Sequence, residues 1–166
     1  MKNLEKKLVE DLDLDILKLL GEDGREFKSN IAEKLKASPN TIKKHIEDME
    51  AEGIIKSYGV QIDFEKLGYE IIALIELTIS KGMMLNVEQE IANNPHVFAV
   101  YDVTGPYDAI ILARFKTRAE LSALVKEINS FEYVVRTNTH LILNIIKEES
   151  NFAKLIEFEN AKEQKP

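Results

Sequence analysis

Residues 28–55 read KSNIAEKLKASPNTIKKHIEDMEAEGII, and a turn in the middle of this stretch separates two helical segments. The second segment has a well-marked start, because Ser38 can cap it through its hydroxyl and Pro39 suits a first helical position, having no amide hydrogen. Its apolar residues recur at the spacing of one side of a helix: Ile42, Ile46 and Met49. The stretch therefore predicts a helix-turn-helix.

The solvent side of the second helix is polar and basic near its start. A helical wheel places these residues on or beside the side opposite the apolar stripe: Asn40, Thr41, Lys43, Lys44 and Glu47. Residues 34–45 contain four lysines and no acidic residue, although the whole chain has a formal net charge of -7. This local positive charge favours double-stranded DNA as a partner, met by the amino-terminal end of the helix. The alternative is a helical hairpin whose charged face is only solvated.

The second helix is followed by GIIKSY, residues 53–58, which reads as a helix stop and then a wing or linker strand. In that strand Lys56 is placed to reach a phosphate beside the groove. We therefore expect a winged helix-turn-helix DNA-binding domain over residues 1–59 and a linker strand over residues 60–69.

Composition limits the other functions open to the chain. No apolar run among its 166 residues approaches the roughly 18 residues of a membrane span, and the start lacks an apolar signal region, so a cytoplasmic protein without a membrane partner is expected. The absence of cysteine excludes thiolate metal sites and cysteine nucleophiles. His45, His96 and His140, the only histidines, lie far apart in the sequence. We therefore expect no metal site, no cofactor and no enzyme.

The rest of the chain alternates strand and helix patterns. Strands rich in β-branched residues are expected over 70–80, 96–104, 108–115 and 133–146, and helices over 84–93 and 118–129. This βαββαβ order predicts a ferredoxin-like sandwich over residues 70–147. The predicted fold class is thus α+β, with the winged helix-turn-helix domain joined to a carboxyl-terminal ferredoxin-like domain. In the tail, residues 148–166, apolar residues at helical spacing allow a short helix: Phe152, Leu155 and Ile156.

Both faces of the predicted sheet are largely apolar. In the first strand the odd positions from 71 to 79 are all apolar, and the even positions include Ile72 and Leu74. Two helices cover only one face of a four-stranded sheet, so we expect the other face to be buried by the same face of a second copy. A homodimer follows, and an isolated apolar surface is the alternative. The charged residues expected on this second face, where they could pair across it, are Glu76, Arg114 and Arg136.

Three segments in order resemble one known family. The helix-turn-helix is followed by GIIKSYGVQIDFEKLGY, then by VFAVYDVTGPYDAIILARFKT and FEYVVRTNTHLIL. Over about residues 12–147 the chain is similar to the Lrp/AsnC transcriptional regulators, also called feast/famine regulatory proteins. The resemblance implies a winged helix-turn-helix domain, a ligand-binding βαββαβ domain, dimers that assemble into tetramers, octamers or higher forms, and control of transcription by amino acids.

The resemblance also implies which residues of the second helix meet DNA: Ser38, Asn40, Thr41, Lys43, Lys44 and His45. Asn40 and Lys44 are expected at base edges, because an amide pairs well with adenine and a lysine with guanine. The residues expected to position phosphates are Ser38, Thr41, Lys43 and Lys56. For His45 a packed, neutral side chain is the open alternative to a phosphate contact.

Lys36 stands where the family commonly has a turn glycine. If the backbone there has a positive φ, lysine costs on the order of 1 kcal/mol relative to glycine.

The effector pocket that the resemblance implies lies between neighbouring dimers, and the matching residues are Gly105, Pro106, Tyr107, Asp108, Thr137 and Thr139. Asp108 can accept the ammonium group of an amino acid, while loop amides and threonine hydroxyls can donate to its carboxylate. Pro106 stands where the family often has a polar or acidic residue. The alternative reading is an ordinary hairpin turn beside ordinary strand threonines.

Three functions compete on these grounds. The leading one is a sequence-specific DNA-binding transcriptional regulator whose assembly or DNA binding is modulated by an amino acid or related small molecule. The second is an architectural protein that wraps or bridges DNA with low sequence specificity. The third, an enzyme or its regulatory subunit built on a ferredoxin-like domain, leaves the helix-turn-helix unexplained.

Overall fold

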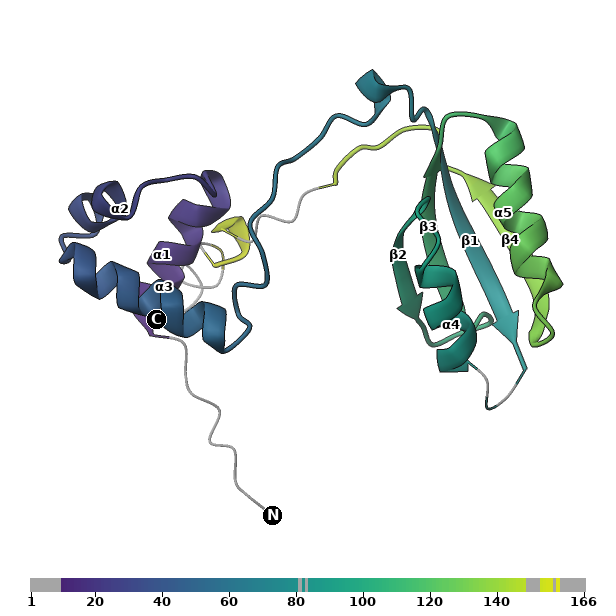
Figure 1. The fold of residues 1–166 in the computed structure, drawn as a ribbon, viewed down its shortest axis with the longest axis horizontal. Coiled ribbons are helices and arrows are strands. Elements are labelled where there is room, and N and C mark those ends of the chain that lie inside the picture. Colours follow the sequence, from purple (N-terminus) through teal and green to yellow (C-terminus); the bar gives the residue numbers. More distant parts are fainter. Residues whose placement is uncertain (1–9, 81, 83, 149–152, 157, 159–166) are drawn as a thin grey trace, which may run out of the picture. The chain divides into compact units, whose positions relative to one another are not determined.

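The computed structural model describes residues 10–80, 82, 84–148, 153–156 and 158. The chain divides into two compact units (Figure 1): Met1–Gln61 together with Glu148–Pro166, and Ile62–Lys147. Among the described residues, no helix is both long and apolar enough to span a membrane.

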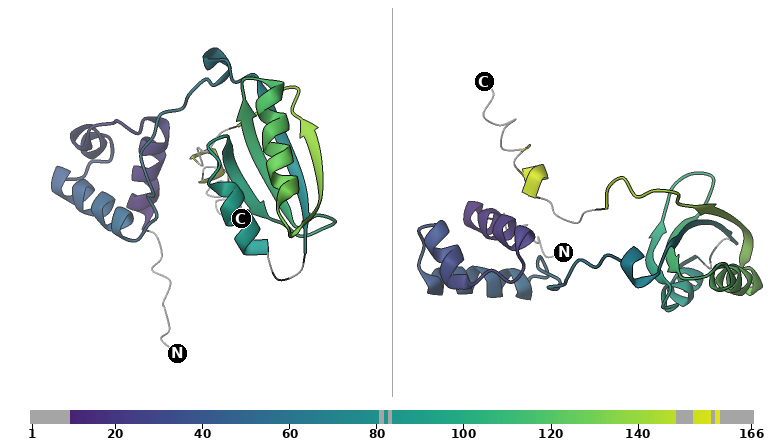
Figure 2. Two further views of the ribbon diagram at one scale, coloured as in Figure 1. Left: turned by 45° about the vertical axis from the view of Figure 1, so that its right-hand side comes forward. Right: turned by 90° about the horizontal axis from the view of Figure 1, so that it is seen from above.

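The amino-terminal part of the first unit contains three helices: α1 (Asp11–Glu22), α2 (Lys28–Lys34) and α3 (Pro39–Ala51). They pack around one small core (Figures 1 and 2), whose buried members are Ile16, Ile31, Ala32, Ile42, Ile46 and Met49. The apolar stripe predicted for the second helix of the helix-turn-helix is therefore confirmed. Burial of this stripe against α1 and α2 fixes which side of α3 remains in solvent.

The expected wing or linker strand does not form within this chain, since none of residues 54–63 takes part in a strand. A strand exists only where a neighbouring strand accepts and donates its ladder hydrogen bonds. The segment instead folds back on α3, because the amides of Ile54 and Ile55 donate to the Met49 carbonyl at 2.9 and 3.1 Å. Further along, Tyr58 Oη donates to Glu50 Oε1 at 2.8 Å.

The second unit contains one antiparallel sheet with two helices on it. The strands are β1 (Ile71–Ile79), β2 (Val97–Asp102), β3 (Ala109–Phe115) and β4 (Val134–Leu141), in the spatial order β2-β3-β1-β4. The helices α4 (Met84–Ala92) and α5 (Arg118–Ser130) lie on the same side of the sheet (Figure 2), and a short 3-10 turn, Glu65–Leu67, precedes β1. The predicted βαββαβ sandwich is confirmed.

The fourth strand is shorter than the predicted range of 133–146. Its partner is β1, which begins at Ile71, and the last bond between the two segments runs from the Ile142 amide to the Ile72 carbonyl at 2.9 Å. Beyond that point β1 offers no further ladder positions, so the strand ends although its sequence continues to alternate.

Strand parity separates a covered face of the sheet from an uncovered one. Ala73, Ile75 and Leu77 of β1 have no solvent exposure beneath the helices, whereas Ile72 and Leu74 on the other face are half-buried. The third strand repeats the alternation, with buried odd positions and half-buried even positions from 109 to 115. The predicted division of the sheet residues between two faces is confirmed.

Part of the tail is helical. Residues 153–156 form a helical segment in which Ala153 and Ile156 are buried, while Leu155 is exposed. Phe152, which the sequence analysis grouped with Leu155 and Ile156 at helical spacing, lies outside the described residues.

Candidate DNA-binding and effector sites

The start of α3 is built as the sequence predicted. Ser38 Oγ accepts the Thr41 amide hydrogen at 3.0 Å and lies 2.8 Å from Thr41 Oγ1, so both hydroxyls are held at the first turn. Pro39 is the first helical residue. Since Pro39 has no amide hydrogen and the Thr41 amide is bonded to Ser38, this exposed end of α3 offers the Asn40 amide and two hydroxyls to phosphate oxygens.

The predicted base-contacting residues lie on the solvent side of this same end. Asn40, Lys43 and Lys44 are exposed, and Lys43 Nζ lies 3.7 Å from Glu47 Oε1 one turn along. That exposed ion pair is worth little, so DNA phosphates can compete for Lys43 at small cost. Lys56 is also exposed, in the segment that follows α3.

His45 does not lie with these residues. Its Nδ1 is 2.7 Å from Asp13 Oδ1 on α1, and its side chain is 21% exposed. An α-helix turns about 100° per residue, so His45 points in a different direction from Asn40 and Lys44. Its contact with α1 therefore places it outside the face that those two residues form. Of the two interpretations of His45, a packed side chain or a phosphate contact, the structure thus favours the packed side chain.

Glu10 completes a small cluster around this pair. Asp13 Oδ2 accepts the Glu10 amide hydrogen at 3.0 Å, and the Glu10 side chain accepts in return from the Asp13 backbone, which forms a capping box for α1. Ligand atoms of Glu10, Asp13 and His45 lie within 4.8 Å of one another, a set that could hold a metal ion. Sequence reasoning missed this cluster because helix packing, not sequence spacing, joins Asp13 to His45.

The turn between α2 and α3 contains a strained residue. Lys36 has a φ of 53°, the one positive φ among the described residues other than glycine. Lys36 therefore has a left-handed backbone at the position where the family commonly has glycine, and the expected cost of lysine there applies.

The proposed effector residues lie around the β2–β3 turn and on β4. Gly105, with a φ of 134°, and Pro106 are exposed in the turn, and Tyr107 Oη lies 3.4 Å from Asn138 Nδ2 on the uncovered face. Thr137 and Thr139 pair with Leu77 and Ile75, which places the two threonines on the face covered by the helices. Within one chain the Tyr107 hydroxyl and the two threonines therefore lie on opposite faces of the sheet.

Asp108 has a structural role that the sequence did not reveal. Its Oδ2 accepts the Ile79 amide hydrogen at 2.7 Å, next to the irregularity in the pairing of β1 with β4 at Thr78 and Ile79. Its own amide donates to the Leu77 carbonyl at 2.8 Å. The aspartate therefore fastens the β2–β3 turn to the end of β1.

A polar network occupies the middle of the uncovered face. Glu76 Oε2 lies 3.0 Å from His140 Nε2 and accepts from Asn138 Nδ2 at 2.8 Å. These hydrogen bonds, that of His140 first, hold the pKa of the Glu76 carboxyl below its ordinary value. Arg114 stacks between Phe64 and Phe98, with its guanidinium carbon 4.4 and 4.3 Å from the two ring centres. Within the chain Glu76 thus bonds to His140 and Asn138, while Arg114 contacts aromatic rings.

Helix α4 contains a buried carboxyl group, that of Glu88. Glu88 is 8% exposed, and its Oε1 has no hydrogen-bond partner among the described residues. Burial first, and then the nearby carboxylates of Asp102 and Asp108, raise the pKa of Glu88 above its ordinary value. The raised pKa means that the neutral form of Glu88 is favoured at this position more than in a free glutamate.

Comparison with known proteins identifies both units. Residues 9–56 match the winged helix-turn-helix DNA-binding model, and residues 72–152 match the Lrp/AsnC ligand binding domain. An uncharacterized HTH-type transcriptional regulator of Pyrococcus furiosus is 41% identical over 141 residues, covering 85% of this chain and 95% of the relative. The HTH-type transcriptional regulator LysM of Saccharolobus solfataricus is 32% identical over 136 residues, covering 81% and 94%.

Solved structures share the fold. E. coli AsnC matches with a TM-score of 0.80 at 23% identity, over 86% of this chain and 97% of AsnC. A transcriptional regulator of Neisseria meningitidis, solved in complex with L-Met, matches with a TM-score of 0.78 at 23% identity, over 86% and 94%. Together with the matches of both units, these relatives show that the chain belongs to the Lrp/AsnC family and is a DNA-binding transcriptional regulator that carries an Lrp/AsnC ligand-binding domain.

Proposed function

We propose that this regulator acts as a homodimer or a larger assembly of dimers, that it reads DNA with the amino-terminal half of α3, and that an amino acid or related small molecule modulates its assembly or DNA binding. The observation that carries the proposal is the exposed, capped and basic start of α3, which presents Asn40 and Lys44 to solvent. Because a transcriptional regulator acts on DNA, the proposal places the protein in the cytoplasm and assigns it no catalytic step.

Paired copies are supported by the uncovered face of the sheet. The half-buried Leu74 and Leu112 are partners across β1 and β3, and Phe98 and Tyr101 of β2 are exposed. Burying apolar surface gains roughly 25 cal/mol per Å², so a second copy that covers this face is favoured. Pairing also solves a problem of affinity, because a module with few lysines neutralises few phosphates and two linked modules bind far more tightly than one.

An amino-acid effector is supported by the ligand-binding domain of the family and by the fold shared with the N. meningitidis regulator solved with L-Met. Since Tyr107 and the threonines of β4 lie on opposite faces of one sheet, a pocket that uses them all needs residues from neighbouring copies. We propose Gly105, Pro106, Tyr107, Asp108, Thr137 and Thr139 as its contributors.

The DNA-binding part is tested with Lys44→Ala on a duplex selected from a random pool, against random duplex at the same salt concentration. If Lys44 reads a base, the variant loses about 1–3 kcal/mol on the selected site and little on random duplex. Lys126→Ala is the matched control, because it removes one exposed lysine from α5, outside the helix-turn-helix. An equal loss on all duplexes would assign Lys44 to phosphate, and no loss would remove it from the interface.

The same assay separates the regulator from the architectural alternative. A sequence-specific regulator prefers its selected site to random duplex by a factor of about 10³ or more. Equal affinity for both would favour an architectural protein of low specificity.

The effector part is tested by thermal unfolding of the protein with each of the twenty amino acids, followed by Asp108→Asn with every amino acid that stabilises. A ligand that binds only the native state raises the unfolding temperature, and its stabilising free energy grows with the logarithm of the ratio of its concentration to its Kd. The substitution keeps a side-chain oxygen for the Ile79 amide but removes the charge, so we expect a folded variant without the ligand-induced increase. Asp102→Asn is the control, because it removes a neighbouring carboxylate outside the proposed set.

A further inference from the structure

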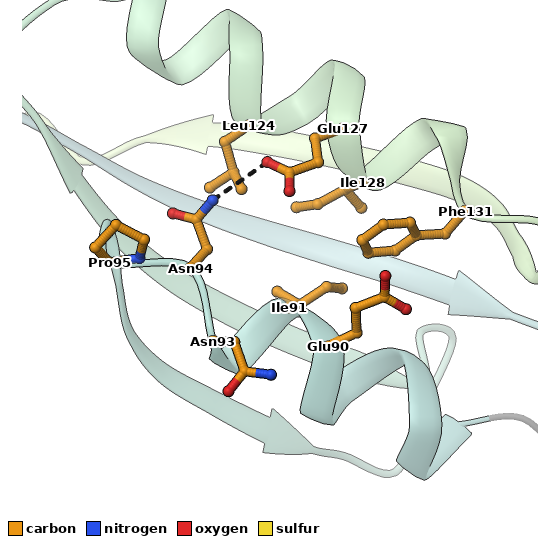
Figure 3. A pocket seen from close by; sticks show the side chains of 9 residues that line it. All are labelled: Glu90, Ile91, Asn93, Asn94, Pro95, Leu124, Glu127, Ile128 and Phe131. Carbon is orange, nitrogen blue, oxygen red and sulfur yellow. Dashed lines mark hydrogen bonds between the residues drawn. The ribbon is translucent and has the colours of Figure 1, made fainter.

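A cavity of about 240 Å³ lies between α4 and α5, in the helical layer that covers the sheet. Figure 3 shows its walls, which come from the last turns of both helices and from the residues that follow α4. None of the proposed effector residues lines it.

The bottom of the cavity is apolar and rigid. Ile91 of α4 and Leu124 and Ile128 of α5 are at most 3% exposed, since they belong to the core of the second unit. Core side chains of this kind leave only a small hydrocarbon area open at the floor of the cavity, and close packing holds that area in a fixed position.

The rim of the cavity is acidic. Glu90 on α4 and Glu127 on α5 are exposed, and no basic residue is found among the described residues that line the cavity. Asn94 Nδ2 donates to Glu127 Oε2 at 3.2 Å, which holds this carboxylate at one side of the opening. In Figure 3 the Glu90 carboxylate lies on the other side, beside the ring of Phe131. The cavity thus offers two separate negative charges above an apolar surface.

Size restricts the ligand further. Pockets for nucleotides and other drug-sized ligands usually measure about 300–1,000 Å³, so the cavity between α4 and α5 is too small for them. A short aliphatic chain with one or two ammonium groups fits both its volume and its charge.

We propose that this cavity binds a small aliphatic cation, either a free diamine or the side chain of a basic amino acid, with its methylene groups on Ile91, Leu124 and Ile128 and its ammonium groups at Glu90 and Glu127. A bound diamine bridges the two helices that cover the sheet. The site is separate from the proposed effector residues, so either assignment can fail without the other.

The test is calorimetric titration of the full chain with 1,4-diaminobutane and with L-lysine at an ionic strength held at about 40 mM in every sample with NaCl, where screening is still weaker than at physiological salt. The variants are Glu90→Gln, Glu127→Gln and the double variant. Each substitution keeps the side-chain size, and glutamine at position 127 still has an oxygen that can accept the hydrogen bond from Asn94. Glu132→Gln is the matched control, because it makes the same charge change at an exposed position just beyond the cavity. 1,4-Butanediol, with the same chain and no charge, controls for apolar binding.

Each single variant is expected to weaken diamine binding by about two- to fivefold, as is usual for exposed ion pairs, and the double variant by about tenfold. Glu132→Gln should keep the wild-type affinity, all variants should keep the wild-type unfolding midpoint, and butanediol should not bind. Tighter binding of lysine with the same dependence on Glu90 and Glu127 identifies an amino acid as the source of the cation. Absence of binding up to about 10 mM ligand, or an equal loss in Glu132→Gln, overturns the proposal, because the latter result assigns the attraction to the net charge of the chain.

Discussion

Lys36 stores backbone strain in the turn before the DNA-reading helix. Its φ of 53° suits glycine, which has no Cβ to clash in this conformation. Relief of this strain in Lys36→Gly should raise the free energy of unfolding by about 1 kcal/mol. Glycine also increases the entropy of the unfolded chain, which offsets part of that gain. Urea denaturation measures it.

Lys36→Ala is the matched control for that substitution. It removes the same charge but keeps the Cβ, so its stability should stay at or below the wild-type value. Equal stabilisation by glycine and alanine would contradict strain and point to relief of charge repulsion instead.

Tyr58 links the segment after α3 back to that helix. Partial burial of Tyr58, which is 51% exposed, and the hydrogen bond to Glu50 raise the pKa of Tyr58 to about 12. A phenol with a raised pKa binds its proton more tightly in the folded state, so its stabilising effect is complete below pH 10 and is lost as pH rises towards 12. We therefore expect the free energy of unfolding to fall with pH in that window.

Tyr58→Phe removes this dependence while it keeps the ring. The comparison is made by urea denaturation of both proteins at pH 9, 10 and 11, so that deprotonation of lysines affects both alike. Parallel curves for the two proteins would show that the hydrogen bond to Glu50 is absent in solution.

At this scale local chemistry was predictable from the sequence and distant pairing was not. The Ser38 cap and the Pro39 start depend on residues within one turn, and both were confirmed. The bond of His45 to Asp13 and that of Asp108 to the Ile79 amide join residues 32 and 29 positions apart. Such contacts arise only when elements pack, so no spacing rule announces them.

Among the elements, α5 starts with a capping box. Thr117 Oγ1 accepts the Glu120 amide hydrogen at 3.2 Å, and the Glu120 carboxylate accepts the Thr117 amide hydrogen at 2.8 Å. Thr117→Ala should lower the free energy of unfolding by about 1 kcal/mol, whereas Thr117→Ser, which retains the hydroxyl, should cost only a few tenths. Thermal and urea unfolding of the three proteins measure the difference; the same cost for both substitutions would place it in the lost methyl group.

Helices and strand faces could be predicted because each carries its own periodicity. The alternation along β1 needs only the residues of β1 itself. The ends of strands depend on a neighbour, which is why 133–146 was too long for β4 and why residues 54–59 formed no wing strand within the chain. Where one chain supplies no partner, an extended segment has nothing to pair with.

The whole molecule is expected to depend on the uncovered face of the sheet. Leu112 lies half-buried in the middle of this face, so Leu112→Asp places a charge where a second copy is proposed to pack. The wild-type protein should sediment as a dimer or larger assembly, and the variant as a single folded chain with weakened DNA binding.

Leu85→Asp is the control for this experiment. Leu85 is 64% exposed on α4, on the other side of the sheet, so the same substitution there should leave the sedimenting mass unchanged. A wild-type protein that sediments as a single copy at micromolar concentration would refute the proposed dimer, and so would a Leu112→Asp variant that stays paired.

The double duty of Asp108 restricts how this regulator can change its signal. The carboxylate proposed to bind an effector also accepts the hydrogen bond that fastens the end of β1. Most substitutions of Asp108 are therefore expected to destabilise the fold, whatever they do to effector specificity. Innovation has more latitude at Pro106, which is exposed and carries no amide hydrogen to lose. A library randomised at position 106 should therefore yield many folded proteins with new preferences, and one randomised at position 108 mostly aggregates.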